Sequence, residues 1–297
     1  MKACKLVTCI LGFVLALMAT VTAADAPPLT FKFTTVSVPG AVDTQPHGVN
    51  NAGVIVGQYR DKKQALHGYI LNGKKLTKLD HPNGVDTACF GINLNGASVI
   101  VGYYFDDFTA GYVGFVYKSG KFTDIPDLAG ATASYAYGIN DSGEIVGAFT
   151  DSAGLMHGFL LKGKKYKTLD VPGATTITAA TGINNKGSIV LYWTDSTGAY
   201  EGSLYNGKTY KTIDVPGAFR ESIPSGINDE GDVTFQWYDS IATVVRGALL
   251  HDGKYFKFND PKGVERETFP AGVNDHHAIV GSYFNHIFDA QGFTATY

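Results

Sequence analysis

The chain has 297 residues, of which 44% are hydrophobic and 17% are charged, and its formal net charge is −3. Its 24 basic residues do not exceed its 27 acidic ones, and no stretch concentrates lysine or arginine. The composition therefore argues against a nucleic-acid partner and against recruitment to an anionic lipid surface.

Residues 1–24 have the pattern of a secretory signal peptide. Lys2 and Lys5 form a basic start, residues 6–18 are mostly apolar, and small residues follow at 21–23. We expect export to the periplasm or the extracellular space, a short linker at 25–30, and no membrane span, because no later apolar stretch is long enough. The mature chain would be a monomer with one cysteine, Cys89, buried and without a disulfide partner.

The rest of the chain is a repeat built on the sequence Gly-[Ile/Val]-Asn. This anchor recurs at intervals of 43 to 47 residues. The six anchor glycines are Gly48, Gly91, Gly138, Gly182, Gly226 and Gly272. Such a period indicates stacked copies of one supersecondary unit, none of which can bury its apolar surface alone.

Each unit predicts four short strands. In the third unit a turn at 140–143 leads to an apolar run at 145–149, a second run at 158–161 and an alternating run at 166–171, and Pro172-Gly173-Ala174 closes the unit. The strand that enters the anchor completes the set. The runs are rich in Val, Ile, Tyr, Phe and Thr and are bounded by Gly, Asn, Asp and Pro, which is typical of antiparallel strands joined by tight turns. Four strands in about 45 residues predict a propeller blade.

The two ends of the chain complement each other. Residues 31–41 match the fourth strand of a unit, as at 210–218, whereas the last unit stops after its third strand, near 292–297. We therefore predict an all-β, six-bladed propeller of four-stranded antiparallel blades. Its single domain covers 31–297, and its N-terminal strand completes the last blade and removes an exposed sheet edge.

The pattern GINDxGxIVGxYxDxxGxxHGFLxxxGxxxTxDxPGA resembles the bacterial extracellular HAF-type repeat, over residues 31–297. The similarity is weaker in the last unit, where His276 and His277 replace the usual x-Gly of the turn and Asn285 replaces the Asp. The resemblance implies an exported, propeller-like repeat protein and no established activity.

We expect the strand that enters each anchor to be innermost. The Asn-Asp-x-Gly and Gly-Lys turns then lie on one face of the ring, which we call the turn face. The Pro-Gly-Ala segments and Asp-x-x-Gly loops lie on the other, which we call the loop face. The connections of the loop face are longer and more variable, so we expect it to bind ligands.

Three sets of polar residues recur at fixed repeat positions. We expect the anchor asparagines to open tight turns. The acidic set could bind Ca²⁺, but a local turn in which the carboxylate accepts backbone hydrogen bonds explains it more simply. We expect the hydroxyl set to cap the incoming backbone, with a polar pocket as the alternative. The three sets are Asn50, Asn93, Asn140, Asn184, Asn228 and Asn274; Asp61, Asp106, Asp151, Asp195 and Asp239, with Asn285 sixth; and Thr44, Thr87, Ser134, Thr178, Ser222 and Thr268.

The position just before each hydroxyl is irregular, and departures from a repeat are where a site can be grafted onto a scaffold. Charges gather there and nearby in units five and six, at the expected channel mouth. The candidate ligand-binding residues are Asp43, Asp86, Arg220, Glu221, Glu265, Arg266, Glu267 and His286. The alternative is a set of solvated surface ion pairs.

Two groups of histidines lie elsewhere in the repeat. His251, His276 and His277 fall in turns of units five and six and could ligate zinc, but no acid or cysteine at a metal-ligand spacing accompanies them. We expect no metal site there. His67 and His157 share one repeat position, where we expect a packing role.

The sequence favours a non-catalytic module that binds a glycan or a protein on the loop face. It has no nucleophile elbow, phosphate loop or dinucleotide fingerprint. The aromatics expected at the surface are Tyr103, Phe108, Trp193 and Trp237. One alternative is a propeller hydrolase or lyase with a metal or carboxylate cluster at the channel mouth. A second is a structural envelope protein.

Overall fold

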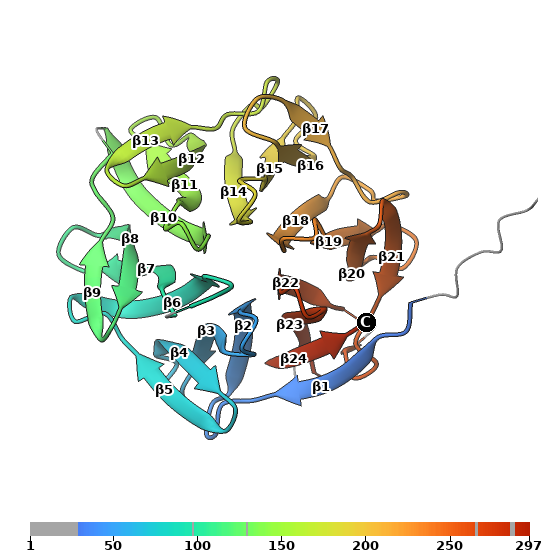
Figure 1. Ribbon diagram of the computed structural model, residues 1–297, viewed down its shortest axis with the longest axis horizontal. Coiled ribbons are helices and arrows are strands. Elements are labelled where there is room, and N and C mark those ends of the chain that lie inside the picture. Colours follow the sequence, from blue (N-terminus) through green and yellow to red (C-terminus); the bar gives the residue numbers. More distant parts are fainter. Residues whose placement is uncertain (1–28, 97, 129, 265–266, 286–288) are drawn as a thin grey trace, which may run out of the picture.

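The computed structural model describes residues 29–96, 98–128, 130–264, 267–285 and 289–297. Six four-stranded antiparallel sheets radiate from a central axis and form a closed ring (Figure 1). The predicted signal peptide and most of the linker lie outside the described residues. The predicted six-bladed propeller is confirmed, and the strand that enters each anchor is the innermost of its blade.

The first three blades follow the chain in order. Blade 1 comprises β2 (Asp43–Val49), β3 (Ile55–Arg60), β4 (Leu66–Asn72) and β5 (Lys75–Leu79). Blade 2 comprises β6 (Gly84–Ile92), β7 (Ile100–Asp106), β8 (Gly111–Lys118) and β9 (Lys121–Asp124). Blade 3 comprises β10 (Ala131–Ile139), β11 (Ile145–Asp151), β12 (Met156–Lys162) and β13 (Lys165–Thr168).

The last three blades repeat this order, except that the outer strand of blade 6 comes from the other end of the chain. Blade 4 comprises β14 (Thr178–Ile183), β15 (Ile189–Thr194), β16 (Tyr200–Tyr205) and β17 (Tyr210–Thr212). Blade 5 comprises β18 (Ser222–Ile227), β19 (Val233–Asp239), β20 (Val244–His251) and β21 (Lys254–Phe258). Blade 6 comprises β22 (Phe269–Val273), β23 (Ala278–Phe284), β24 (Ala290–Thr296) and β1 (Lys32–Val36).

The closure of the ring by the N-terminal strand is confirmed. β1 pairs with β24 in antiparallel register from Lys32 opposite Thr296 to Val36 opposite Gly292. The two strands lie side by side at the outer edge of blade 6 (Figure 1). The ring of Phe33 packs edge-on against Phe293, with centroids 5.4 Å apart. Side-chain packing therefore supports the backbone ladder that joins the two ends of the chain.

The core lies between neighbouring blades. Val146 and Leu160 of blade 3, for example, belong to one buried cluster with Ile189 and Leu191 of blade 4. A twisted four-stranded sheet has two apolar faces, and each face is buried only when another blade stacks on it. Each blade is thus stabilised mainly by its neighbours.

The fourth strands are shorter than the sequence pattern suggested. In blade 3 the strand ends at Thr168, although the alternation of apolar residues continues to Val171. Leu169 and Val171 are both buried. The Leu169 N–H still donates to the carbonyl oxygen of Gly158 in β12, 2.8 Å away, and the side chains of Leu169 and Val171 pack beneath the loop face.

The anchor asparagines open the turns as predicted, and they also join the blades. In blade 4 the Oδ1 of Asn184 accepts hydrogen bonds from the backbone N–H groups of Lys186 and Ser188. Its Nδ2 donates to the carbonyl oxygen of Asn228 in blade 5, 2.9 Å away. The same inter-blade bond joins Asn228 to Asn274, and Asn274 to Asn50 across the closure of the ring.

The acidic and hydroxyl sets also have the structural roles expected of them. Asp151 Oδ1 accepts hydrogen bonds from the backbone N–H groups of Ala153 and Leu155, and Asp61, Asp106, Asp195 and Asp239 form equivalent turns. Hydroxyls such as that of Thr44 accept from the incoming backbone, here the N–H of Val38, and Thr87, Ser222 and Thr268 do likewise. Ser134 differs, because its Oγ accepts from the N–H of Gly114 in β8 of the preceding blade.

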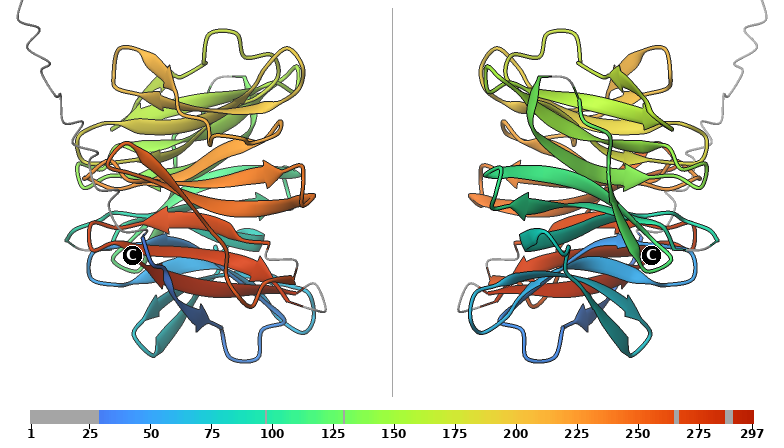
Figure 2. Two further views of the ribbon diagram at one scale, coloured as in Figure 1. Left: turned by 90° about the vertical axis from the view of Figure 1, so that its right-hand side faces the viewer. Right: turned by 90° about the vertical axis from the view of Figure 1, so that its left-hand side faces the viewer.

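Strands of all six blades cross the thickness of the ring from one face to the other (Figure 2). Because each blade is antiparallel, the first and third connections of a blade lie on the turn face and the second lies on the loop face with the inter-blade segments. No helix within the described ranges is long and apolar enough to cross a bilayer.

Candidate functional site

Each innermost strand has a β-bulge immediately before its anchor glycine. In blade 1 the register passes from Pro46 opposite Gly57 to Gly48 opposite Val56, which leaves His47 unpaired. A bulged residue is turned away from the ordinary alternation of the sheet, which re-aims its side chain. The six residues at this position are His47, Phe90, Tyr137, Thr181, Ser225 and Ala271.

The anchor glycines allow neighbouring inner strands to approach closely around the axis. A Cβ atom on Gly48 would lie 2.5 Å from the carbonyl oxygen of Phe90, and one on Gly272 would lie 2.8 Å from that of His47. Both distances are too short for a carbon atom, so any larger residue would force the strands apart. The bulged side chains meet in the channel because their backbones lie this close together.

The bulged residues line a central cavity of about 320 Å³. Three residues of second strands and one of an inner strand complete its wall: Tyr103, Tyr192, Gln236 and Ile223. These four residues lie between the anchor glycines and the loop face. The reason is the direction of the strands: β18 runs from the loop face to the turn face, whereas β15 and β19 run from the turn face to the loop face. A smaller cavity of about 190 Å³ adjoins the first through His47, Gln236 and Ala271.

One side of the cavity is aromatic and comes from blades 1 to 4. The rings of His47 and Phe90 are stacked, with centroids 4.1 Å apart and planes inclined by 13°. Phe90 also stacks on Tyr103 at 5.2 Å and meets Tyr137 edge-on at 5.3 Å. The contacts form a continuous wall whose rings hold one another in place.

The opposite side is small and polar and comes from blades 4 to 6. The hydroxyl of Thr181 donates to the carbonyl oxygen of Pro224 at 2.7 Å, and Ser225 Oγ lies 3.0 Å from the hydroxyl of Thr234. Gln236 Nε2 donates to the carbonyl oxygen of Pro270 at 3.3 Å. The cavity therefore has two chemically different walls facing each other.

His47 has a buried nitrogen without a hydrogen bond. Its Nε2 and the Oε1 of Gln58 are both buried and both lack a hydrogen-bond partner among the described residues. Burial lowers the pKa of His47 to about 4, and the nearby Gln58 amide opposes this shift only partly. The imidazole is therefore neutral near pH 7, and its Nε2 is buried near the side chain of Gln58.

The tyrosines of the wall are also neutral. Burial raises the pKa of Tyr103, Tyr137 and Tyr192 above the usual range of a phenol. A neutral phenol both donates and accepts a hydrogen bond. Since no charged side chain among the described residues lines the cavity, the site suits an uncharged ligand with apolar faces and hydroxyl or amide groups.

Among the candidates named from the sequence, Asp43 is connected to this cavity. Its carboxylate accepts from Gln45 Nε2 at 3.1 Å, and Gln45 Oε1 in turn accepts from Gln58 Nε2 at 2.9 Å. Burial raises the pKa of Asp43, although Gln45 and the positive charge of Arg60 favour the ionised form. Asp43 thus positions the amide that lies beside His47.

The other described candidates make separate contacts and do not form one cluster of interacting side chains. Asp86 Oδ1 accepts from the N–H of Leu66 at 3.2 Å, and Arg220 Nη2 donates to the carbonyl oxygen of Thr197 at 2.7 Å. Burial raises the pKa of Glu221. No hydrogen bond or ion pair joins any two of the described members Asp43, Asp86, Arg220, Glu221 and Glu267. The remaining candidates, Glu265, Arg266 and His286, lie outside the described residues.

The aromatics expected at the surface have different surroundings. Phe108 is exposed, whereas Tyr103 lines the central cavity and Trp193 is half-buried. The expectation for Trp237 is wrong: it is 4% exposed, and its indole N–H donates to the carbonyl oxygen of Gly247. Its ring belongs to the packed interface between blades 4 and 5, which the repeat pattern alone does not distinguish from the surface.

His67 and His157 connect two parts of their own blades. His157 lies 3.0 Å from Asp170 and 3.3 Å from Asp151, so it connects the end of the fourth strand to the loop-face turn. Burial lowers the pKa of His157, but its hydrogen bonds to Asp170 and Asp151 outweigh this effect and raise it overall. His67 bridges Asp80 and Asp61 in the same way.

Reasoning from the sequence missed the bulged residues, which are the principal lining of the site. A signal was present: the position before the anchor glycine holds six different residues, although the next position is always glycine and the preceding one is always proline, alanine or cysteine.

Comparison with known proteins supports the fold alone. No protein-family model matches the sequence, and no curated protein matches it. Among solved structures, the fucose-recognising lectin of Aleuria aurantia, a six-bladed propeller, is 12% identical, covers 89% of this chain and 90% of its own, and has a TM-score of 0.54. AofleA from Arthrobotrys oligospora is 11% identical over 89% of this chain and 82% of its own, with a TM-score of 0.53. The propeller domain of the Trilobed protease from Pyrococcus furiosus is 12% identical over 86% and 94%, with a TM-score of 0.51. This chain thus shares its architecture with lectin propellers among others.

Proposed function

We propose that this protein is an exported, non-catalytic propeller that binds a neutral saccharide unit in its central cavity, from the loop face. The observation that carries the proposal is the pairing of an aromatic wall with an amide and hydroxyl wall around a cavity of about 320 Å³. That volume lies at the lower end of the range of about 300–1,000 Å³ typical of small-molecule sites.

The chemistry of the walls fits a sugar ring. A pyranose has apolar C–H faces that pack on aromatic rings, such as those of Phe90 and Tyr137, and equatorial hydroxyls that need hydrogen-bond partners at its rim. Gln236 and the tyrosine hydroxyls supply such partners without charge. A charged ligand would gain no counter-charge from these residues.

Two further features support the proposal. The fold is that of the Aleuria lectin, which recognises fucose. The repeat resembles the bacterial extracellular HAF-type repeat, and residues 1–24 have the pattern of a signal peptide. We therefore expect the protein to be exported to the periplasm or to the outside of the cell. A ligand in that compartment would include cell-surface or environmental glycans.

The test is a glycan array followed by calorimetric titration of the best monosaccharide, with L-fucose in the panel. We expect Phe90→Ala and Gln236→Leu each to weaken binding about tenfold or more, which corresponds to about 1.4 kcal/mol. Phe108→Ala changes an exposed aromatic that does not line the cavity, so it is the matched control and should bind normally. Equal affinity in all four proteins, with unchanged melting temperatures, would show that saccharides bind elsewhere. Turnover of the bound saccharide would instead favour the hydrolase or lyase alternative.

A further inference from the structure

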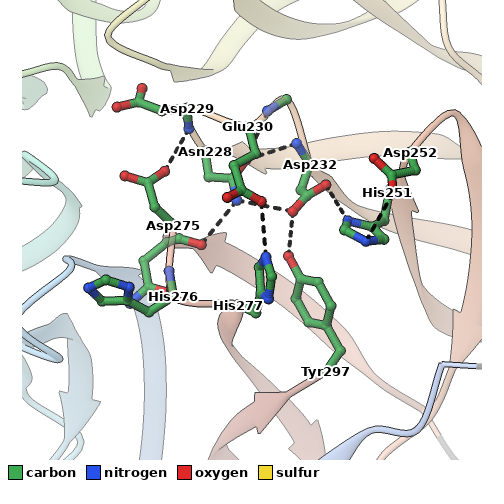
Figure 3. Close-up of polar contacts among 12 residues, drawn as sticks. Asn228, Asp229, Glu230, Asp232, His251, Asp252, Asp275, His276, His277 and Tyr297 are labelled. Carbon is green, nitrogen blue, oxygen red and sulfur yellow. Dashed lines mark hydrogen bonds and ion pairs between the residues drawn. The ribbon is translucent and has the colours of Figure 1, made fainter.

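A second polar cluster lies on the turn face, at the seam between blades 5 and 6 (Figure 3). The turn between β18 and β19 supplies Glu230 and Asp232, and the turn between β22 and β23 supplies His277. His277 Nε2 lies 2.9 Å from Glu230 Oε2. One ligand atom from each of the three side chains lies within 4.8 Å of the others. A single ion could therefore contact all three.

His277 occupies a backbone position that favours glycine. Its φ is +57°, and it stands at the fourth position of its turn. The same position holds glycine with φ between +75° and +96° in the other five blades: Gly53, Gly96, Gly143, Gly187 and Gly231. A side chain in this left-handed region is strained. Here the repeat replaces a favourable glycine with an imidazole directed at two carboxylates.

Asp232 is a buried carboxylate, and no lysine or arginine in the described part of the chain forms an ion pair with it. Its side chain is 4% exposed and accepts from Tyr297 Oη at 2.7 Å, and His251 Nδ1 lies 2.7 Å from its other oxygen. In blade 3 the equivalent pair is Glu144 and Lys162, an ion pair at 2.5 Å. Blade 5 thus has histidine where blade 3 has lysine, and it leaves the charge of Asp232 to be neutralised by another group.

We propose that Glu230, Asp232 and His277 bind a divalent transition-metal ion of the zinc class, which joins the turns of blades 5 and 6. One imidazole nitrogen and two carboxylates are a ligand set that zinc accepts, with water in the remaining position. His251 and Tyr297 would orient Asp232 from the outer shell. Tyr297 also stacks on His277, with centroids 4.8 Å apart, so the ion would secure the C-terminal end of the chain at the closing blade.

His276 provides an internal control. It is exposed, adjacent in sequence to His277, and points away from the two carboxylates (Figure 3). If zinc bound non-specifically to exposed histidines, substitution of His276 would weaken zinc binding as much as substitution of His277. The glycine substitution of His277 is also conservative for the backbone, because five blades already carry glycine there.

The experiment is calorimetric titration of the EDTA-treated protein with ZnCl₂, together with melting curves with and without the metal. We expect one zinc per chain and a higher Tm with zinc. His277→Gly should fold, lose the zinc-dependent rise in Tm and bind zinc at least about 100-fold more weakly, and Tyr297→Phe should bind about 10–100-fold more weakly. His276→Ala should match the wild type. Normal zinc binding by His277→Gly, loss of binding in His276→Ala, or a rise in Tm with CaCl₂ but not with ZnCl₂ would each overturn the proposal.

Discussion

His47 and Phe90 stack face to face across the seam between blades 1 and 2, with ring centroids 4.1 Å apart. Each is the bulged residue before its anchor glycine, and the two are more than forty positions apart in sequence. Their contact exists only because the inner strands of adjacent blades approach closely. The wall of the cavity is therefore a property of the assembled ring, and changes that loosen the seams should weaken both stability and binding.

The first prediction concerns pH. The pKa of His47 falls from 6.5 to about 4 on folding. Between these values the unfolded chain binds a proton that the folded chain does not, so His47 destabilises the fold as the pH falls from 6.5 toward 4. The full effect is about 3 kcal/mol at 1.36 kcal/mol per pKa unit. The free energy of unfolding, measured in urea across this range, should show it.

The matched variant for this prediction is His47→Phe, which places at the blade 1 bulge the residue that blade 2 already carries. Carboxylates elsewhere titrate in the same pH range in both proteins, so the difference between the two curves reports His47. Parallel curves for wild type and variant from pH 6.5 to pH 4 would show that the imidazole is solvated in the folded state.

The second prediction concerns ring closure. Removing residues 31–38 deletes β1 and leaves β24 with a bare edge, so the melting temperature should fall markedly. A finer test is Phe33→Ala, which removes the edge-on contact with Phe293 and should cost about 2 kcal/mol. Thr34→Ala, an exposed change on the same strand, should stay within about 0.5 kcal/mol of wild type. A truncated protein that melts like the full chain would count against closure by this strand.

The third prediction concerns the turn of blade 3. Gly143 has a φ of +75°, and a Cβ atom there would meet nothing within 4 Å. Gly143→Val should therefore destabilise the protein through the backbone alone, by about 1–2 kcal/mol. Ser142→Val, at the exposed neighbouring position, tests whether the effect comes from the added side chain. Similar denaturation midpoints for the two variants would contradict this explanation.

The fourth prediction separates turn formation from inter-blade bonding. Asn184 and Asn206 both accept two local backbone hydrogen bonds, but Asn184 also donates to the carbonyl oxygen of Asn228 in the next blade. Asn184→Ala should cost about 2–3 kcal/mol because it removes three hydrogen bonds of a buried side chain, one of which joins two blades. Asn206→Ala, at an exposed turn, should cost less than about 1 kcal/mol. Equal losses in chemical denaturation would mean that the inter-blade bond contributes nothing.

The architecture could be predicted because the same strand and turn pattern occurs in six repeat units. The anchor spacing gave the number of blades, and the match between residues 31–41 and the fourth strand of other units gave the closure. The turn roles of Asn184 and Asp151 follow from local hydrogen bonding, which neighbouring residues determine. Local chemistry of this kind is visible in any one copy.

The sites could not be predicted in the same way, because they depend on contacts between copies. The bulge that re-aims His47 depends on the register between two strands, and a sequence read at a strand period assigns that residue to the wrong face. Glu230 and His277 come from turns of adjacent blades. The sequence around His277 has no acidic residue at a metal-ligand spacing, because the carboxylate beside it comes from another repeat unit. Trp237 was misplaced for the same reason, since the neighbouring blade buries it.

The most direct test of the central claim is a crystal structure of the protein with its best-binding monosaccharide. We predict electron density for one sugar ring in the central cavity, against Phe90 and Tyr137 and within hydrogen-bond distance of Gln236. Density for the sugar only at the outer edges of the blades or on the turn face, with the central cavity filled by water, would contradict the assignment.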